Sequence, residues 1–129
     1  MNISYDFVVP TAKEYTKALK AVKKQISAQQ KSMLERHFRN LHHTASFAQL
    51  AQAMGAEEYQ QAIDSYNQLG QLLGDQLGMG YLESVSRPGE PFCCSALGSG
   101  NPYRAEDAEY QLVMHRELVE AIWKLKWFK

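Results

Sequence analysis

The chain has 129 residues, 45% of them hydrophobic and 22% charged, and its 14 basic and 14 acidic residues give a formal net charge of zero. This size and composition are typical of a globular protein, so we expect residues 1–129 to form a single domain. No apolar run approaches the roughly 20 residues of a membrane-spanning helix, and the N-terminus shows no secretory signal pattern. We therefore expect a cytoplasmic protein without a membrane partner.

The charges are distributed unevenly along the chain. Residues 1–40 hold eight basic residues (Lys or Arg) and three acidic residues. Residues 41–110 hold two basic and nine acidic residues, and residues 111–129 hold four basic and two acidic residues. A basic beginning and an acidic middle would attract different macromolecular partners.

Residues 11–41 are predicted to be a basic helical segment, preceded by a short strand over residues 3–9. Thr11 and Glu14 have the spacing of a capping box, and Ser27 can begin a second helix, so the segment is either one helix or two. Helical spacing predicts a buried face of Tyr15, Leu19, Val22, Ile26, Met33, Leu34, Phe38 and Leu41. The same spacing predicts an exposed row of Lys13, Lys17, Lys20, Lys24 and Lys31.

Residues 44–78 have the pattern of a helix-turn-helix unit. A second capping box, Ser46 with Gln49, begins a short helix, and Gly55 can adopt the left-handed conformation that ends it. The following helix has the clearest apolar periodicity in the chain and is stopped by Gly78 and Gly80. Two glycines inside it, at positions 70 and 74, indicate that another backbone packs closely there.

Residues 81–114 predict a small antiparallel sheet, and residues 115–127 a closing helix. The sheet is expected to have strands over residues 81–86, 91–97 and 109–114, with a loop over residues 98–107. Both tryptophans of the closing helix, Trp123 and Trp127, are expected to pack in the core. The predicted fold is α+β and mostly helical, a helix-turn-helix core with a small antiparallel sheet in a winged-helix-like arrangement.

The sequence contains no recognisable catalytic or metal-binding pattern. Adjacent Cys93 and Cys94 are expected to be free thiols, one buried and one partly exposed. The four histidines, His37, His42, His43 and His115, lack the spacing that directs two ligands from one helix. We therefore expect no catalytic residue, metal ion or cofactor, although a thiol mechanism is possible if the fold brings a cysteine and a histidine together.

The lysine row and the glutamines of the second helix favour nucleic-acid binding. Lysines contact phosphates, and glutamines at positions 60, 61 and 68 can contact base edges. The leading hypothesis is a non-catalytic nucleic-acid-binding domain with DNA as its partner, acting through Lys13, Lys17, Lys20, Lys24, Lys31, Gln60, Gln61 and Gln68. The alternative for the lysines is an ordinary solvated helix face.

The acidic residues near the start of the second helix support a different hypothesis. Glu57, Glu58 and Asp64 would repel phosphates and suit a basic protein surface. The alternative function is therefore a protein-interaction module, such as an inhibitor or immunity protein in phage or toxin conflict. Glu57 and Glu58 also fit the first turn of a helix, where the helix dipole favours carboxylates without any partner.

Two stretches carry a family pattern, Thr44…Leu50-Ala51…Gly55…Tyr59…Tyr66…Leu69-Gly70…Leu73 and Met114-His-Arg-Glu-Leu118…Ala121…Leu125…Trp127. They resemble the N-terminal accessory module, itself helix-turn-helix-like, of some bacterial HNH-type restriction endonucleases. The resemblance implies a domain without catalysis that helps a nuclease engage DNA in a restriction or phage-defence context. Ile63 and Asn67 depart from the module's usual Asn and Gly, and the resemblance does not extend to a nuclease segment.

Overall fold

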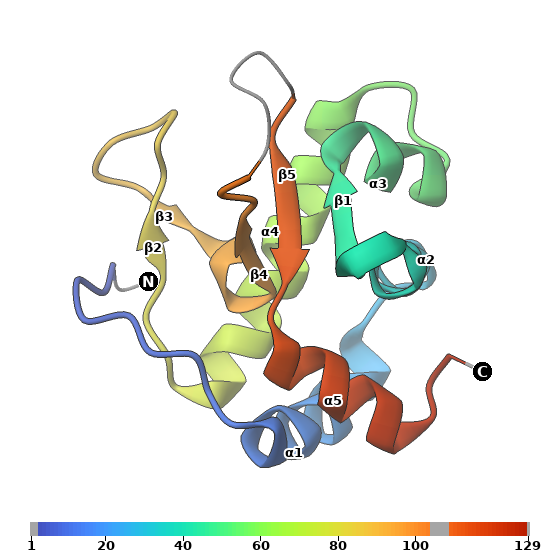
Figure 1. Ribbon diagram of the computed structural model, residues 1–129, viewed down its shortest axis with the longest axis vertical. Helices are drawn as coiled ribbons and strands as arrows, with labels where there is room; N and C mark the ends of the chain where they lie inside the picture. The colour runs from blue at the N-terminus through green and yellow to red at the C-terminus, as the bar shows by residue number, and fades with distance from the viewer. Residues whose placement is uncertain (1–2, 104–108, 129) are drawn as a thin grey trace.

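The computed structural model describes residues 3–103 and 109–128 and has an α+β, mostly helical fold with small antiparallel sheets, as predicted (Figure 1). In chain order the elements are α1 (Ala12–Val22), the 3₁₀ turn η1 (Lys23–Gln25), α2 (Ala28–Arg39), η2 (Leu41–His43), β1 (Thr44–Ser46), α3 (Phe47–Met54), α4 (Tyr59–Leu77), β2 (Leu82–Glu83), β3 (Pro91–Phe92), η3 (Cys93–Ala96), β4 (Gly98–Gly100), β5 (Gln111–Met114) and α5 (Arg116–Leu125). No helix in the described part of the chain combines the length and apolar character needed to cross a membrane.

Side-chain caps determine where the helices begin. The hydroxyls of Thr11, Ser27 and Ser46 each accept the N–H of the residue three positions later, and all three caps form complete capping boxes. The cap at Ser27 decides between the two alternatives for residues 11–41, because it starts α2 separately from α1. The segment is therefore two helices joined by η1.

Glycines end α3 and α4 as predicted and allow close packing within α4. Gly55 and Gly78 adopt left-handed φ values of 76° and 70° at the two helix ends. Gly70 lies against the backbone of η3, where a Cβ atom would collide with the carbonyl of Cys93. Gly74 likewise makes room for the ring of Tyr81. These contacts attach the chain that follows α4 to the surface of that helix.

The main sheet has three antiparallel strands in the order β1-β5-β4. Thr44 pairs with Val113, and Gly98 pairs with Met114. The sequence predicted β5 but not β1, and it predicted a loop where β4 lies. Strands of three residues are too short to show alternation, and Gly-Ser-Gly has low β-propensity, so the pairing with β5 defines both strands. Residues 104–108 of the predicted loop lie outside the described residues.

One predicted strand is wrong and another is shorter than predicted. In residues 3–9 there is an isolated bridge between Ile3 and Tyr81 in place of a strand. The predicted strand over residues 91–97 ends at Phe92, and η3 follows, because the chain turns to pack beneath Gly70 of α4. This turn buries both Cys93 and Cys94, so the expected partly exposed thiol is also wrong.

Two apolar residues expected in the core lie at the surface. Leu41 is 80% exposed, because the chain leaves α2 at Arg39 and turns sharply through His42 and His43, both with positive φ. Trp123 is 72% exposed and stacks on Phe38 from outside, with ring centroids 6.5 Å apart. Helical spacing placed both residues on the apolar side, but neither faces the packed interior.

The elements divide the molecule into two ends. Helices α1 and α5 pack against each other at the lower end of Figure 1. The β2–β3 hairpin lies on one side of the upper half, and α2 and α3 lie on the other, with the main sheet between them. Helix α4 passes behind the sheet and contacts α1, α3 and η3, so it connects the two ends.

Candidate binding surfaces

The buried histidines His37 and His115 donate hydrogen bonds to backbone carbonyls, and burial lowers the pKa of both. His37 is fully buried, and its Nε2 lies 2.8 Å from the carbonyl oxygen of Leu112. Because a carbonyl oxygen can only accept a hydrogen bond, Nε2 is the donor. The other ring nitrogen, Nδ1, therefore accepts a hydrogen bond from the Tyr66 hydroxyl at 2.7 Å. Desolvation lowers the pKa of His37 to about 4. The same cause lowers the pKa of His115, whose Nε2 donates to the carbonyl of Ser95.

The two cysteines are poorly suited to covalent chemistry. Burial raises the pKa of the Cys93 thiol and raises that of Cys94 well above its usual value. Because the thiolate is the nucleophile, a raised pKa suppresses reactivity at neutral pH. Within the described residues, no group of three or more His, Cys, Asp or Glu side chains is arranged to hold a metal ion.

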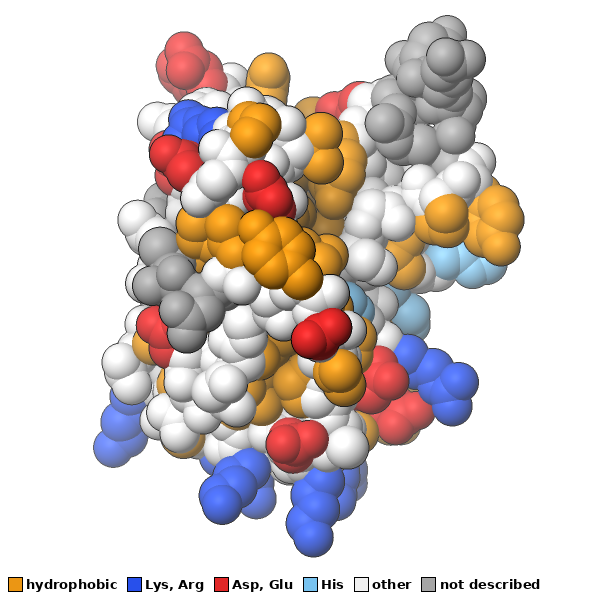
Figure 2. All heavy atoms as spheres, turned by 90° about the vertical axis from the view of Figure 1, so that its left-hand side faces the viewer, with side chains coloured by type: hydrophobic (Ala, Val, Ile, Leu, Met, Phe, Trp, Pro, Cys, Tyr) orange, Lys and Arg blue, Asp and Glu red, His pale blue; other side chains and the backbone are white. Residues whose placement is uncertain are grey.

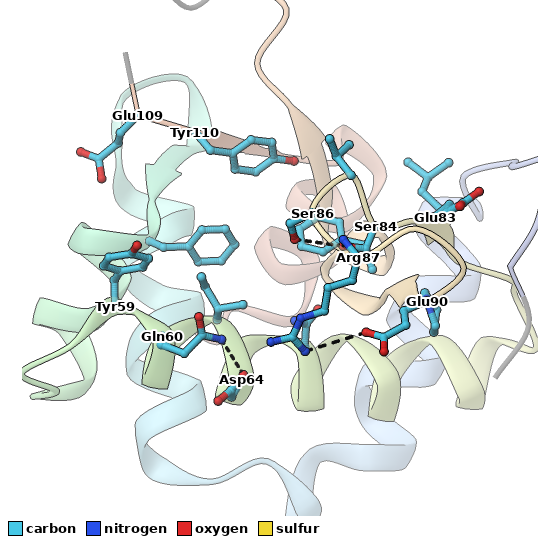
Figure 3. A pocket seen from close by; sticks show the side chains of 17 residues that line it. Tyr59, Gln60, Asp64, Glu83, Ser84, Ser86, Arg87, Glu90, Glu109 and Tyr110 are labelled. Atoms are coloured by element: carbon cyan, nitrogen blue, oxygen red, sulfur yellow. Dashed lines mark hydrogen bonds and ion pairs between the residues drawn. The ribbon is translucent and has the colours of Figure 1, made fainter. Parts of the chain in front are cut away.

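A groove with a volume of about 750 Å³ lies between α4 and the β2–β3 hairpin. Figure 3 shows Tyr59, Gln60 and Asp64 along α4 on one side and Ser84, Ser86 and Arg87 from the hairpin on the other. We call this site the α4 groove; it is lined by Phe47, Tyr59, Gln60, Ile63, Asp64, Asn67, Leu82, Glu83, Ser84, Val85, Ser86, Arg87, Glu90, Pro91, Phe92, Glu109 and Tyr110.

Aromatic rings give the α4 groove an ordered apolar lining. Tyr110 stacks on Phe47 with ring centroids 6.0 Å apart and meets Phe92 edge-on at 6.2 Å. Such ring pairs contribute beyond their buried area and hold one another in place. Tyr59 and Val85 extend the apolar surface outward and are 62% and 96% exposed. The groove therefore offers unburied apolar area next to an organised floor.

The charged side chains of the α4 groove are mostly acidic. Its lining includes four carboxylates, Asp64, Glu83, Glu90 and Glu109, and one guanidinium, Arg87. Arg87 lies 3.8 Å from the carboxylate of Glu90, so this cation is already paired (Figure 3). Asp64 accepts a hydrogen bond from Gln60, and Glu83 accepts the N–H of Gly89. Asp64, Glu83 and Glu90 therefore have partners that fix their side chains, and four acids against one arginine give the lining a net negative charge.

The structure brings together part of the predicted sites. Gln60 and Asp64 line the α4 groove, whereas Gln61 and Gln68 are exposed on α4 outside that lining. Glu57 and Glu58 are exposed and precede α4, with Glu58 at the N-cap position but making no side-chain cap, so neither lies in the first turn as expected. The hairpin side of the groove was not predicted from the sequence. The one indication of it was Val85, an apolar residue beside the polar residues of the predicted turn.

The second candidate surface is cationic and lies at the α1–α5 end. We call it the cationic end and define it by Lys13, Lys17, Lys20, Lys23, Lys24, Lys124 and Lys126, all exposed. Figure 2 shows most of the visible Lys and Arg side chains at the lower end of the molecule, where Figure 1 places α1 and α5. Lys31 is also exposed but belongs to α2.

The lysines of the cationic end are not neutralised within the described residues. The ion pairs among the described residues all use arginines, namely Arg39 with Glu35, Arg87 with Glu90 and Arg116 with Glu120. Lys23 has an additional contact over the ring of Trp127, 6.0 Å from its centroid. The ammonium groups are therefore available to an anionic partner.

Comparison with family models, curated proteins and solved structures found no match to this chain. The two surfaces accordingly rest on their own geometry and charge.

Proposed function

We propose that this protein is a non-catalytic nucleic-acid-binding domain that contacts the phosphate backbone of DNA through its cationic end. The observation that supports the proposal is the set of exposed lysines on α1 and η1, which form no ion pair with any residue of 3–103 or 109–128. Lys13, Lys17 and Lys20 follow one face of α1, with about 10 Å of helix axis between the first and the last. A row of this kind can neutralise several phosphates without reading any base.

Helix α4 is a poor base reader in this proposal. The hairpin stands beside its N-terminal half, and Asp64 and Glu83 of the α4 groove would repel phosphates at close range. Gln60 is already hydrogen-bonded to Asp64. We therefore propose binding with little sequence preference, and we leave Gln61 and Gln68 without a base-reading role.

The order of elements supports a DNA-related origin for the domain. From α2 onward the chain runs helix, strand, helix, helix, then β4 and β5, and β1 pairs with β5. This order is compatible with the proposed winged-helix-like arrangement, in which residues 78–97 would be an addition between α4 and β4. Together with the resemblance to an endonuclease accessory module, it suggests a role in restriction or phage defence.

The direct test compares two variants with equal loss of positive charge. In K13Q/K17Q/K20Q the proposed contacts are removed, and in R39Q/R87Q/R116Q three cations outside the lysine row are removed. We expect the lysine variant to bind a 20-base-pair duplex at least tenfold more weakly at 50 mM NaCl, and its slope of log affinity against log salt to fall by about 2 to 3.

Fluorescence anisotropy measures the affinity of each variant for the duplex, and the arginine variant shows the effect of losing three positive charges outside the lysine row. It should keep its affinity within about threefold, because its three cations are paired with carboxylates and none belongs to α1 or η1. If both variants lose the same affinity for the duplex, net charge alone explains the loss. If the unmodified protein does not bind the duplex at 50 mM NaCl, the proposed function is excluded.

A further inference from the structure

We propose that the α4 groove binds a positively charged segment of another protein, which inserts an aromatic or aliphatic side chain between α4 and the hairpin. This inference goes beyond the proposed nucleic-acid function and uses none of its lysines. It also relocates the protein-interaction hypothesis, because only Asp64 of the three acids first assigned to it lines the groove.

The shape and lining of the groove indicate an apolar anchor. Phe47, Phe92 and Tyr110 form a packed floor, and the volume of about 750 Å³ accommodates a large side chain with its neighbours. Buried aromatic anchors in preformed pockets carry most of the binding energy of protein interfaces. The organised rings therefore provide a receiving surface that needs little rearrangement.

The charges around the groove indicate the flanking residues of the bound segment. Asp64 lies on α4, Glu83 on β2 and Glu109 just before β5, so three different elements contribute acidic residues to the groove lining. Arg87, the cation of the lining, is paired with Glu90. A segment with Lys or Arg on either side of its anchor would match this distribution, whereas a nucleic acid would be repelled.

The exposed apolar residues at the edge favour a protein segment over a small molecule. Val85 lies in the hairpin loop and Tyr59 at the start of α4, and their exposed fractions are 96% and 62%. Tyr59 belongs to the α4 side of the groove lining and Val85 to the hairpin side. A ligand that fills the floor and also covers both residues must extend beyond the groove, as a peptide does.

The test selects displayed random nine-residue peptides on the immobilised protein at 150 mM NaCl. We expect enrichment of peptides in which Trp, Phe or Leu adjoins Lys or Arg. The best peptide should bind D64N/E83Q/E109Q at least tenfold more weakly and the charge-matched control E57Q/E58Q/E120Q within threefold of the unmodified protein. Each substitution replaces a carboxylate by an amide of the same size, so hydrogen bonds to Gln60 and Gly89 can persist.

A second variant tests the apolar part without touching the packed floor. Y59S/V85S changes exposed residues and should weaken the same peptide about tenfold while the circular dichroism spectrum is unchanged. The proposal is overturned if no peptide is enriched, if the enriched peptides lack basic residues, or if binding survives in the groove variants. The proposal is also overturned if the unmodified protein self-associates in sedimentation and D64N/E83Q/E109Q does not, because the groove would then bind a second copy of this chain.

Discussion

The cationic end and the α4 groove show how a chain of zero net charge can present two opposite surfaces. At the cationic end, charge is carried by long exposed side chains of α1, of η1 and of the C-terminal end of α5. At the groove, carboxylates surround an aromatic floor. The first arrangement suits a partner recognised by charge alone, and the second suits one recognised by charge and shape together.

The two regions also differ in how the chain builds them. Lys13, Lys17 and Lys20 all lie on α1 and therefore come together whenever α1 forms. The α4 groove combines α3, α4, the hairpin and the start of β5, so it exists only when these segments are packed correctly. A change that loosens tertiary packing should therefore damage the groove before it damages the lysine row.

The largest expected effect tests this difference through the contact of α4 with η3. In Gly70→Ala the new Cβ would collide with the backbone carbonyl of Cys93, and we expect a loss of about 3 kcal/mol in the free energy of unfolding. Urea denaturation measures it. Peptide binding at the groove should be lost at lower urea concentration than the helical signal.

Gly55→Ala is the matched control, because Gly55 has a positive φ but open space around its missing Cβ. Strain in the left-handed region should reduce stability by about 1 to 2 kcal/mol. If Gly70→Ala is no more destabilising than this control, the close contact of η3 with α4 does not hold the hairpin in place.

The next effect concerns acid and acts on the scaffold that both surfaces share. Folding lowers the pKa of His37 from about 6.5 to about 4, so between these values the unfolded chain binds the proton more readily. The stabilisation is complete above the unfolded pKa and is lost as the pH falls. From pH 7 to 4.5 we expect the free energy of unfolding to decrease by about 2 kcal/mol through this group.

Urea denaturation at the two pH values measures this change, and His37→Gln provides the comparison. The variant cannot titrate, so its loss of stability over the same interval should be smaller by about 2 kcal/mol. An NMR titration of the unmodified protein gives an independent check, because the His37 ring should remain neutral down to about pH 4. A ring that titrates near 6.5 would contradict the buried network with Tyr66.

Sequence reasoning succeeded where the determining interactions are local. The caps at Thr11 and Ser46 and the turns at Gly55 and Gly78 all depend on residues within a few positions of one another. Even the close packing at Gly70 was predictable, although its partner was not. The α+β class follows from the same local signals.

The sequence could not predict features that depend on distant segments. Strands β1 and β4 exist because each pairs with β5, and η3 forms where the chain meets α4. The α4 groove was missed for the same reason: Phe47 and Tyr110 are 63 residues apart in the chain and meet only in the fold. Asp64 was identified for its charge, but its neighbours Glu83 and Glu109 come from other elements.

The smallest expected effect is the coupling between the two surfaces. They share no residue, and at 0.15 M ionic strength charges interact weakly beyond about 8 Å. We therefore expect a saturating 20-base-pair duplex to change the Kd of the selected peptide by less than twofold. Fluorescence polarisation of the labelled peptide, with and without duplex, measures the change.

The converse titration makes this prediction stringent. Because coupling free energy is reciprocal, the peptide must change the Kd of the duplex by the same factor as the duplex changes that of the peptide. Mutual exclusion in both directions would mean that DNA and peptide compete for one region, contrary to the separation of Lys13 and Lys17 from Asp64 and Glu83. A change in one direction alone would violate linkage and would indicate that the basic peptide binds the duplex directly. The variant K13Q/K17Q/K20Q can reveal this side reaction, because its substitutions do not affect binding between peptide and duplex.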